Sequence, residues 1–141
     1  MVLNLNMKKV SFDFDSTLDR EDVQEFARTL SLTGYEVWIT TSRQDTDNAL
    51  ARGHHWVERQ NEQLYEVATS CWIKKDHIKF TEFVDKIEFI EGKDFLFHLD
   101  DDVEELVLIA ESNDDCVPVD VNLPVWKDKC LEILKISDES I

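Results

Sequence analysis

Stretches of apolar, β-favouring residues alternate with helical patterns along this chain of 141 residues. Five stretches have the composition of strands: Lys8–Phe14, Tyr35–Thr41, His77–Phe80, Phe95–Leu99 and Cys116–Val121. Between them, apolar residues recur three and four positions apart, which is the spacing of an amphipathic helix. Strands that alternate with helices pair in parallel, because each crossover returns the chain to the same end of the sheet. The sequence therefore predicts an α/β fold with a five-stranded parallel sheet and helices on both faces.

The predicted helices are short, and no connection is long enough for a second domain. Four helices are marked by their apolar positions: Val23, Phe26, Ala27 and Leu30; Gln60, Leu64, Val67, Ala68 and Cys71; Val103, Leu106, Val107 and Ala110; and Trp126, Cys130 and Ile133 behind Pro124. A further helix is predicted to begin at Thr81 and to carry Phe83, Ile87 and Ile90 on one face. Ser42–His55 lacks an apolar period and is predicted to be a loop. We expect one domain over residues 1–141, a Rossmann-like three-layer sandwich without a separate cap domain.

Acidic residues dominate the charge of the chain. Lys and Arg number 15 against 31 Asp and Glu, which gives a net charge of −16. This charge argues against nucleic acid and anionic membranes as partners and favours divalent cations. No apolar run approaches the length of a transmembrane helix. Cys71, Cys116 and Cys130 lie in apolar patterns without metal-ligand spacing, so we expect reduced core residues and a cytoplasmic location.

Two carboxylates follow the first predicted strand. In the run Val10–Leu18, an apolar stretch leads into Asp13 and Asp15, and Thr17 follows two positions later. Residues two apart in a strand point to the same side, so both carboxylates are expected to converge where the strand meets its loop. Two hard oxygen donors suit Mg²⁺. A carboxylate beside a bound cation can attack a phosphoryl group, because the cation offsets the repulsion between the two anions.

This run resembles the first motif of the haloacid dehalogenase superfamily, an apolar strand followed by Asp-x-Asp-x-Thr. An acid at the position of Asp15 resembles the phosphatase branch of that superfamily. The resemblance implies that Asp13 is the nucleophile and that Asp15 is the general acid and base. It also implies that Mg²⁺ is held by Asp13, by the backbone carbonyl of Asp15 and by Asp100. The alternative interpretation is a polar strand end followed by a helix cap, in which these residues have no catalytic role.

Two further strand ends carry residues that resemble motifs of this superfamily. The second predicted strand ends in Thr41, Ser42 and Arg43. Thr41 matches a hydroxyl that donates to the phosphoryl oxygens, and the Thr-x-Arg form resembles the small phosphatases and nucleotidases. The third predicted strand leads into Lys86, which the resemblance implies is the lysine that neutralises the attacking carboxylate. Two other lysines are alternatives for this role: Lys79 and Lys93.

The fourth predicted strand ends in three consecutive carboxylates, Asp100, Asp101 and Asp102. Adjacent carboxylates repel one another unless a cation lies among them. An apolar strand that ends in Asp-Asp resembles the fourth motif, which implies that Asp100 is a direct metal ligand. Asp101 would then bind the metal through water or hold the lysine. Because Asp102 follows directly, the position of the Asp-Asp motif stays open by one residue, unless Asp102 caps the next helix. His98 is expected to be a buried, hydrogen-bonded residue.

The four motifs occur in the order of the superfamily, each at a predicted strand end. The resemblance implies a Mg²⁺-dependent phosphomonoester hydrolase with an aspartyl-phosphate intermediate and a small phosphorylated substrate, nucleotides included. The alternative is a non-catalytic interaction module that binds metal. We expect Arg43, Arg52 and Trp56 to bind the substrate, because the basic loop Gln44–His55 should emerge beside Asp13. Apolar packing explains Trp56 equally well, and the oligomeric state stays open.

Overall fold

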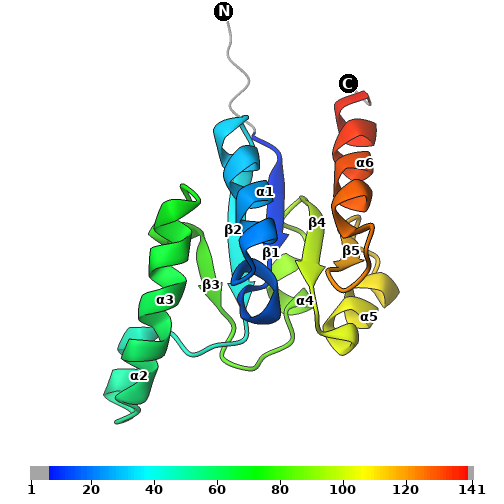
Figure 1. Ribbon diagram of the computed structural model, residues 1–141. Helices are drawn as coiled ribbons and strands as arrows, with labels where there is room; N and C mark the ends of the chain where they lie inside the picture. The colour runs from blue at the N-terminus through cyan, green and yellow to red at the C-terminus, as the bar shows by residue number, and fades with distance from the viewer. Residues whose placement is uncertain (1–6, 140–141) are drawn as a thin grey trace, which may run out of the picture.

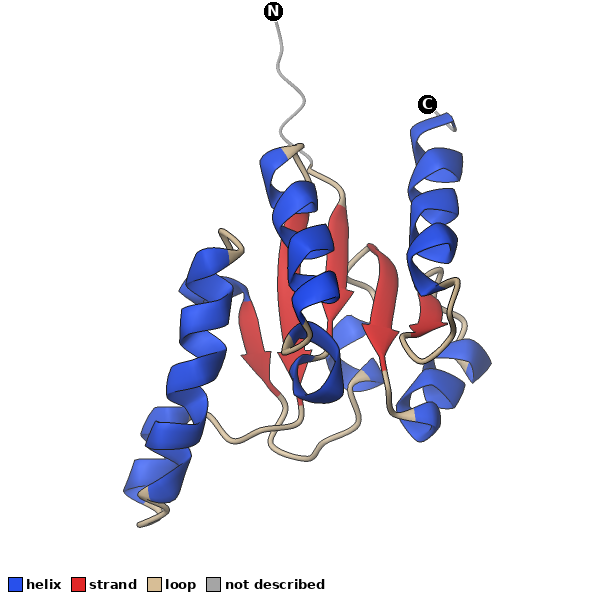
Figure 2. Ribbon diagram, in the orientation of Figure 1, coloured by secondary structure: helices blue, strands red, loops and turns tan. Residues whose placement is uncertain are grey.

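A five-stranded sheet, in which all neighbouring strands are parallel, forms the centre of the computed structural model, which describes residues 7–139 (Figures 1 and 2). The strands are β1 (Lys9–Phe12), β2 (Glu36–Thr41), β3 (Ile78–Phe80), β4 (Phe95–Asp100) and β5 (Val117–Asp120). They lie in the order β3-β2-β1-β4-β5. The predicted α/β class, a Rossmann-like three-layer sandwich with five parallel strands, is confirmed. The predicted domain of residues 1–141 extends beyond the described part at both ends.

Helices cover both faces of the sheet. α1 (Glu21–Leu32), α3 (Trp56–Ser70) and α6 (Trp126–Glu139) pack on one face, and α4 (Ile87–Ile90) and α5 (Val103–Glu111) pack on the other. In Figure 2, α1 and α6 lie in front of the sheet and α4 lies behind it. A short helix, α2 (Thr46–Ala51), lies against α3. In residues 7–139 the connection after β1 holds a wide turn and α1, and the connection after β2 holds α2, α3 and a short 3-10 turn at Lys75–His77, without a separate cap domain.

The alternation of side chains along the strands separates an apolar layer from a polar one. Val10 and Phe12 of β1 are fully buried in the larger core, against α1, α3 and α6. The ring of Phe12 meets that of Phe97 edge to face, with centroids 5.7 Å apart. Full burial of a side chain of this size stabilises the fold by about 1.5–3 kcal/mol. Ser11 lies between Val10 and Phe12, so it faces the opposite side, where buried polar residues collect.

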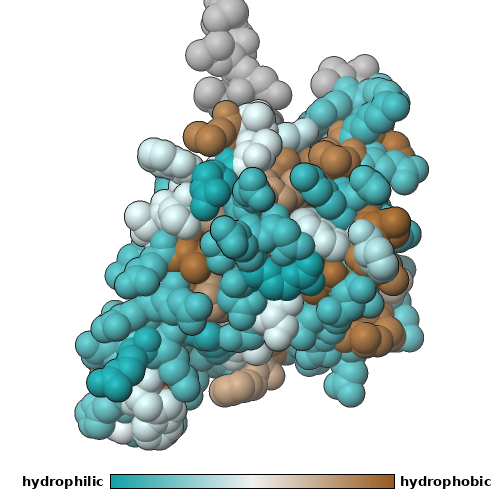
Figure 3. All heavy atoms as spheres, in the orientation of Figure 1, coloured by the Kyte–Doolittle hydropathy of each residue, from teal (hydrophilic) through white to brown (hydrophobic). Residues whose placement is uncertain are grey.

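The outer faces of the helices are polar, and the cysteines are inside. Figure 3 shows hydrophilic residues over most of the face on which α1 and α3 lie. All three cysteines are buried with free thiols, as the sequence predicts. No helix in residues 7–139 has both the length and the apolar character needed to cross a membrane.

The order of the strands reverses direction between β1 and β4. From β1 the chain moves outward to β2 and β3, then crosses back to place β4 on the other side of β1. In open parallel sheets, ligands bind at such a switch point, outside the carboxyl ends of the strands. The ends of β1 and β4 are therefore the place where a site is expected, and they carry Asp13 and Asp100.

The prediction of an unstructured loop over Ser42–His55 is wrong, because α2 lies inside this segment. Asp45 caps the helix, since its side chain accepts a hydrogen bond from the backbone N–H of Asn48. Ala49 is the only buried residue of α2. A helix of this length with one buried position has no apolar period, so periodicity cannot reveal it.

The predicted helix with Ile87 and Ile90 is present as α4, but its predicted start at Thr81 is wrong, because α4 begins only at Ile87 and Phe83 lies outside it. Glu82 and Phe83 have left-handed backbone angles, with φ of 53° and 71°. Three N–H groups of this segment donate to carbonyls at the end of β2 and just beyond it: Thr81 to Thr41 at 2.8 Å, Glu82 to Arg43 at 3.2 Å and Phe83 to Ser42 at 3.0 Å. These donors hold the segment against the end of β2, so it forms a loop that leads into Lys86.

Candidate active site

A wide turn after β1 buries Asp13 and directs Asp15 outward. Asp13 continues the pairing with β4, since its N–H donates to the carbonyl of Leu99 at 2.8 Å. Its own carbonyl accepts from the N–H of Leu18, five residues ahead, at 3.1 Å. Ser16 lies inside this turn with φ of 59°. Because β1 ends at Phe12, the strand period does not extend over both carboxylates, and their side chains do not converge as expected.

A buried lysine joins the ends of β1 and β4. The Nζ atom of Lys86 donates to Oδ1 of Asp13 at 2.8 Å and to Oδ2 of Asp100 at 2.7 Å. All three side chains are almost fully excluded from solvent. The backbone N–H of Lys86 donates to the Glu105 carboxylate of α5 at 2.9 Å, which fixes the lysine at the start of α4. Of the three lysines that the sequence left open, Lys86 is the one at the carboxylates, while Lys79 places its ammonium over the ring of Phe89.

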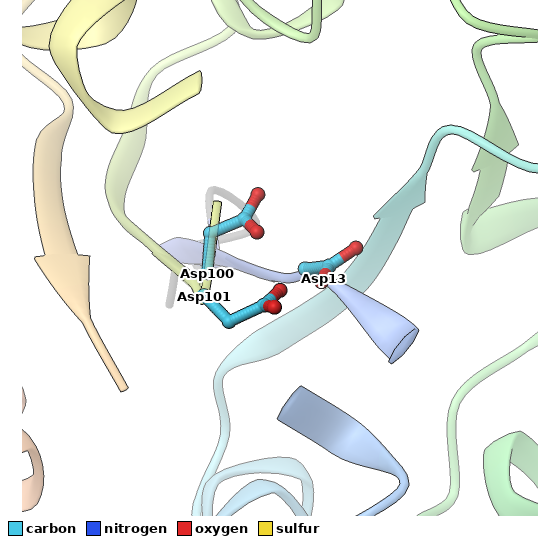
Figure 4. Close-up of side chains that lie close together, drawn as sticks. All are labelled: Asp13, Asp100 and Asp101. Atoms are coloured by element: carbon cyan, nitrogen blue, oxygen red, sulfur yellow. The ribbon is translucent and has the colours of Figure 1, made fainter. Parts of the chain in front are cut away.

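Three carboxylates gather beside this lysine. One oxygen each from Asp13, Asp100 and Asp101 lies within 4.8 Å of the others. Figure 4 shows the three side chains at the ends of two neighbouring strands. Burial is the main cause that raises the pKa of Asp13, and the neighbouring carboxyl groups of Asp100 and Asp101 act in the same direction. Two facing carboxylates need a shared proton or a cation between them, so the donor set fits a hard divalent ion such as Mg²⁺.

A chain of hydrogen bonds on the polar side of the sheet orients Asp100. His98 is fully buried, and its Nε2 atom lies 2.8 Å from Oδ2 of Asp100. Its Nδ1 atom lies 2.8 Å from the hydroxyl of Ser11, which in turn lies 2.8 Å from that of Thr40. Burial lowers the pKa of His98, so the ring is neutral at pH 7. A carboxylate only accepts, so we assign the proton to Nε2, and Ser11 then donates to Nδ1.

The charges at the site differ between its two strand ends. Burial raises the pKa of Asp13 to about 9, since the loss of hydration outweighs the charge of Lys86. Burial acts on Asp100 in the same direction, but the hydrogen bond from His98 and the charge of Lys86 outweigh it, so the pKa of Asp100 lies well below its usual value. Burial lowers the pKa of Lys86, and the two carboxylates raise it above its usual value. Without a metal ion, the ammonium therefore forms an ion pair with Asp100 beside a protonated Asp13.

Thr41 and Arg43 lie at the end of β2, next to β1 in the sheet. Thr41 is fully buried, and its hydroxyl accepts a hydrogen bond from the N–H of Arg43 at 3.3 Å. The guanidinium of Arg43 binds both oxygens of Asp15, at 2.7 and 2.9 Å, and lies over the ring of Phe14. It also donates to the carbonyl of Gln60 at 2.7 Å. Arg43 thus ties the exposed carboxylate of Asp15 to α3.

A pocket of about 470 Å³ opens beside this ion pair. Its lining includes Asp15, Arg43, Trp56, Arg59 and Phe83. Trp56 thus lines a pocket next to Asp15 and Arg43, and its predicted role in substrate binding stays a prediction. Arg52 does not line the pocket, because its guanidinium is held by Glu82 at 2.9 Å and by Gln44 at 3.4 Å.

The structure assigns positions to the remaining predicted residues and adds others. The side chain of Asp102 accepts from the N–H groups of Glu104 and Glu105, so it caps α5 while Asp100 and Asp101 lie at the cluster. His98 is buried and hydrogen-bonded, as expected. Two residues near the site were not predicted to belong to it: Ser11 and Phe83. A lone hydroxyl in an apolar strand was a signal for Ser11, whereas no local pattern marks Phe83 as exposed.

Comparisons of the chain with protein-family models, with curated proteins and with solved structures find no match. The fold and the site define an α/β protein with a doubly wound parallel sheet. A lysine and three carboxylates lie at the switch point of this sheet.

Proposed function

We propose that the protein is a Mg²⁺-dependent phosphomonoester hydrolase that acts through an aspartyl-phosphate on Asp13. The observation that carries the proposal is the buried Lys86 between Asp13 and Asp100, beside Asp101. This constellation combines a nucleophile, a fixed positive charge and a set of oxygen donors at one strand edge. Those are the parts that phosphoryl transfer requires, since the reaction depends on positioning and on stabilising charge.

The residues of the chain have separate roles in this mechanism. The carboxylate of Asp13 attacks phosphorus, and the bond from phosphorus to the leaving oxygen breaks. Lys86 stabilises the negative charge on Asp13 and on the transferring group, and the hydroxyl of Thr41 is a further donor at the end of β2. Asp13, Asp100 and Asp101 would hold Mg²⁺, which supplies positive charge that favours the ionised form of Asp13.

Asp15 would move the protons of the reaction. It protonates the leaving oxygen in the first step and removes a proton from the attacking water in the second. The water attacks phosphorus, the bond to Asp13 breaks and inorganic phosphate leaves. Arg43 binds both oxygens of Asp15, so the acid must exchange this partner before it protonates a substrate. Substrate binding offers Arg43 a second anion, the phosphoryl group itself.

The same ion pair favours a second candidate function, a non-catalytic module that binds metal and a partner. In that case Arg43 would keep Asp15 permanently away from the carboxylate cluster. Turnover separates the two functions. A catalytic protein hydrolyses phosphomonoesters only with Mg²⁺, whereas an interaction module binds the ion without turnover.

Replacement of the nucleophile tests the proposed function. Asp13→Asn should lower kcat for phosphomonoester hydrolysis by at least about 10³-fold, because the amide cannot form the covalent intermediate. Asp128→Asn is the matched control, since Asp128 is an exposed residue of α6. Phosphate release is measured with and without Mg²⁺, and acid-quenched protein is tested for a hydroxylamine-labile acyl phosphate. Normal turnover in Asp13→Asn, or no Mg²⁺-dependent turnover in the unmodified protein, contradicts the proposal.

A further inference from the structure

We propose that the pocket beside Asp15 binds a nucleobase, so that the substrates are nucleoside monophosphates. This inference rests on the proposed function, because it identifies the group that leaves with the oxygen. An acid that protonates the leaving oxygen must touch it, so the rest of the leaving group lies on the side of Asp15. The pocket lined by Asp15 and Arg43 is on that side, and its volume of about 470 Å³ is that of a small-molecule site.

Phe83 supplies the first aromatic surface of the pocket. Its side chain is 75% exposed, and its backbone is left-handed with φ of 71°. Left-handed backbone is uncommon for a bulky residue, and an exposed ring gains nothing from core packing. The backbone N–H of Phe83 donates to the carbonyl of Ser42, so the main chain that carries the ring is held against the segment just beyond β2. An exposed ring on a fixed backbone at a pocket is a surface for stacking.

Trp56 supplies the second aromatic surface. It is the first residue of α3, and its side chain is 59% exposed. The indole stacks on the ring of His54, with centroids 4.9 Å apart and planes at 28°. His54 is itself held, since its Nδ1 atom lies 2.9 Å from Oε1 of Gln44. An indole held on one side by a second ring is prepared to stack a ligand on the other.

Polar groups in the same pocket suit the edge of a base. The side chains of Gln60 and Gln63 are exposed there, and each amide offers both donors and an acceptor. Arg59 adds a positive charge to the pocket beside the Arg43–Asp15 ion pair, in a chain with a net charge of −16. A nucleobase presents a flat aromatic face together with an edge of donors and acceptors, whereas a sugar or a short alcohol presents no aromatic face.

Three variants with matched chemistry test the subsite. Trp56→Ala and Phe83→Ala each remove one ring of the pocket. Trp72→Ala is the control, because Trp72 is 67% exposed with a left-handed φ of 62° and does not line the pocket. The measured quantity is the ratio of kcat/KM for AMP or UMP to kcat/KM for glycerol 3-phosphate. This ratio should fall about 10-fold in each pocket variant and change less than about twofold in Trp72→Ala.

A binding measurement keeps the subsite separate from the catalytic proposal. Adenosine and uridine, which carry no phosphate, are titrated against the protein without Mg²⁺ and followed by NMR at the indole N–H of Trp56. Saturable shifts that Phe83→Ala weakens support the subsite even if no ester is hydrolysed, and the proposed function alone then fails. Hydrolysis of AMP and glycerol 3-phosphate with equal kcat/KM, or shifts that Trp72→Ala weakens equally, overturns the subsite and leaves the proposed function intact.

Discussion

Lys86 is the residue on which the charge balance of the site depends. Its single positive charge lies within 2.8 Å of two buried carboxyl groups, with Asp101 beside them. Two neighbouring carboxylates in a dry site repel each other unless a cation compensates them. Lys86 balances the negative charge of one carboxylate, and the remaining negative charge is balanced by a proton on Asp13 or by a metal ion. In the proposed mechanism, the lysine therefore links the stability of the fold to the binding of Mg²⁺.

Replacement of this lysine should destabilise the metal-free protein. Lys86→Met removes one partner of a buried ion pair, which costs about 3–5 kcal/mol. Saturating Mg²⁺ should recover part of this loss, since the ion binds only the folded carboxylates. Urea unfolding with chelator and with Mg²⁺ measures both effects. Lys79→Met is the control. The exposed ammonium of Lys79 lies over the ring of Phe89, so its removal should lower the free energy of unfolding by less than about 1 kcal/mol. Equal losses in the two variants would contradict the central role of Lys86.

At the scale of the elements, the end of β4 and the start of α5 divide three consecutive carboxylates between two tasks. Asp100 ends β4 inside the site, and Asp102 caps α5 through the N–H groups of Glu104 and Glu105. The strand ends at Asp100 and the helix begins at Val103, so the backbone turns between these two residues. Adjacent residues of the same type thus acquire different roles because they belong to different elements.

This division predicts opposite effects for two alanine variants. Asp102→Ala should lower the free energy of unfolding by about 1 kcal/mol, the usual cost of a lost helix cap, and leave Mg²⁺ activation unchanged. Asp100→Ala should raise the Mg²⁺ concentration for half-maximal activity by at least about 10-fold, because a ligand is lost. Urea unfolding and Mg²⁺ titrations of activity measure the two quantities. A larger shift of the Mg²⁺ titration in Asp102→Ala would move the metal ligand by two residues and refute this assignment.

At the scale of the whole molecule, the buried site makes stability depend on pH. The pKa of Asp13 is about 9 in the folded metal-free protein and close to its usual low value in the unfolded chain. Between these two values the folded state holds a proton that the unfolded state has released. Stability therefore falls as the pH rises through this window, by at most about 1.4 kcal/mol per pH unit.

The comparison with Asp13→Asn isolates this effect from the other ionisable groups. With chelator present, the melting temperature of the unmodified protein should fall relative to that of the variant as the pH rises from about 5 to about 8. Mg²⁺ should make the difference between the two melting temperatures depend less on pH, since the ion replaces the proton between the carboxylates. Parallel melting curves of the two proteins over this range would show that Asp13 does not carry the proton.

The sequence predicted those features of the structure that depend on residues close together along the chain. The apolar runs and the helical spacing predicted the five parallel strands, because burial on both faces of a sheet imposes this composition. The acids after β1 and β4 were visible as strand ends. The sequence was uninformative for α2, which has one buried residue, and for the loop at Phe83, whose donors bind carbonyls around forty residues earlier in the chain.

The sequence by itself therefore determined the class of the fold and the positions at which polar residues leave the strands. Only the tertiary structure decided which of them meet. The strand order places Asp13 beside Asp100, 87 positions later, and the loop before α4 selects Lys86 among three lysines. The turn after β1 directs Asp15 to Arg43. The reason is physical: strand and helix patterns follow from neighbours along the chain, whereas strand order and side-chain direction beyond a strand end follow from packing between distant segments.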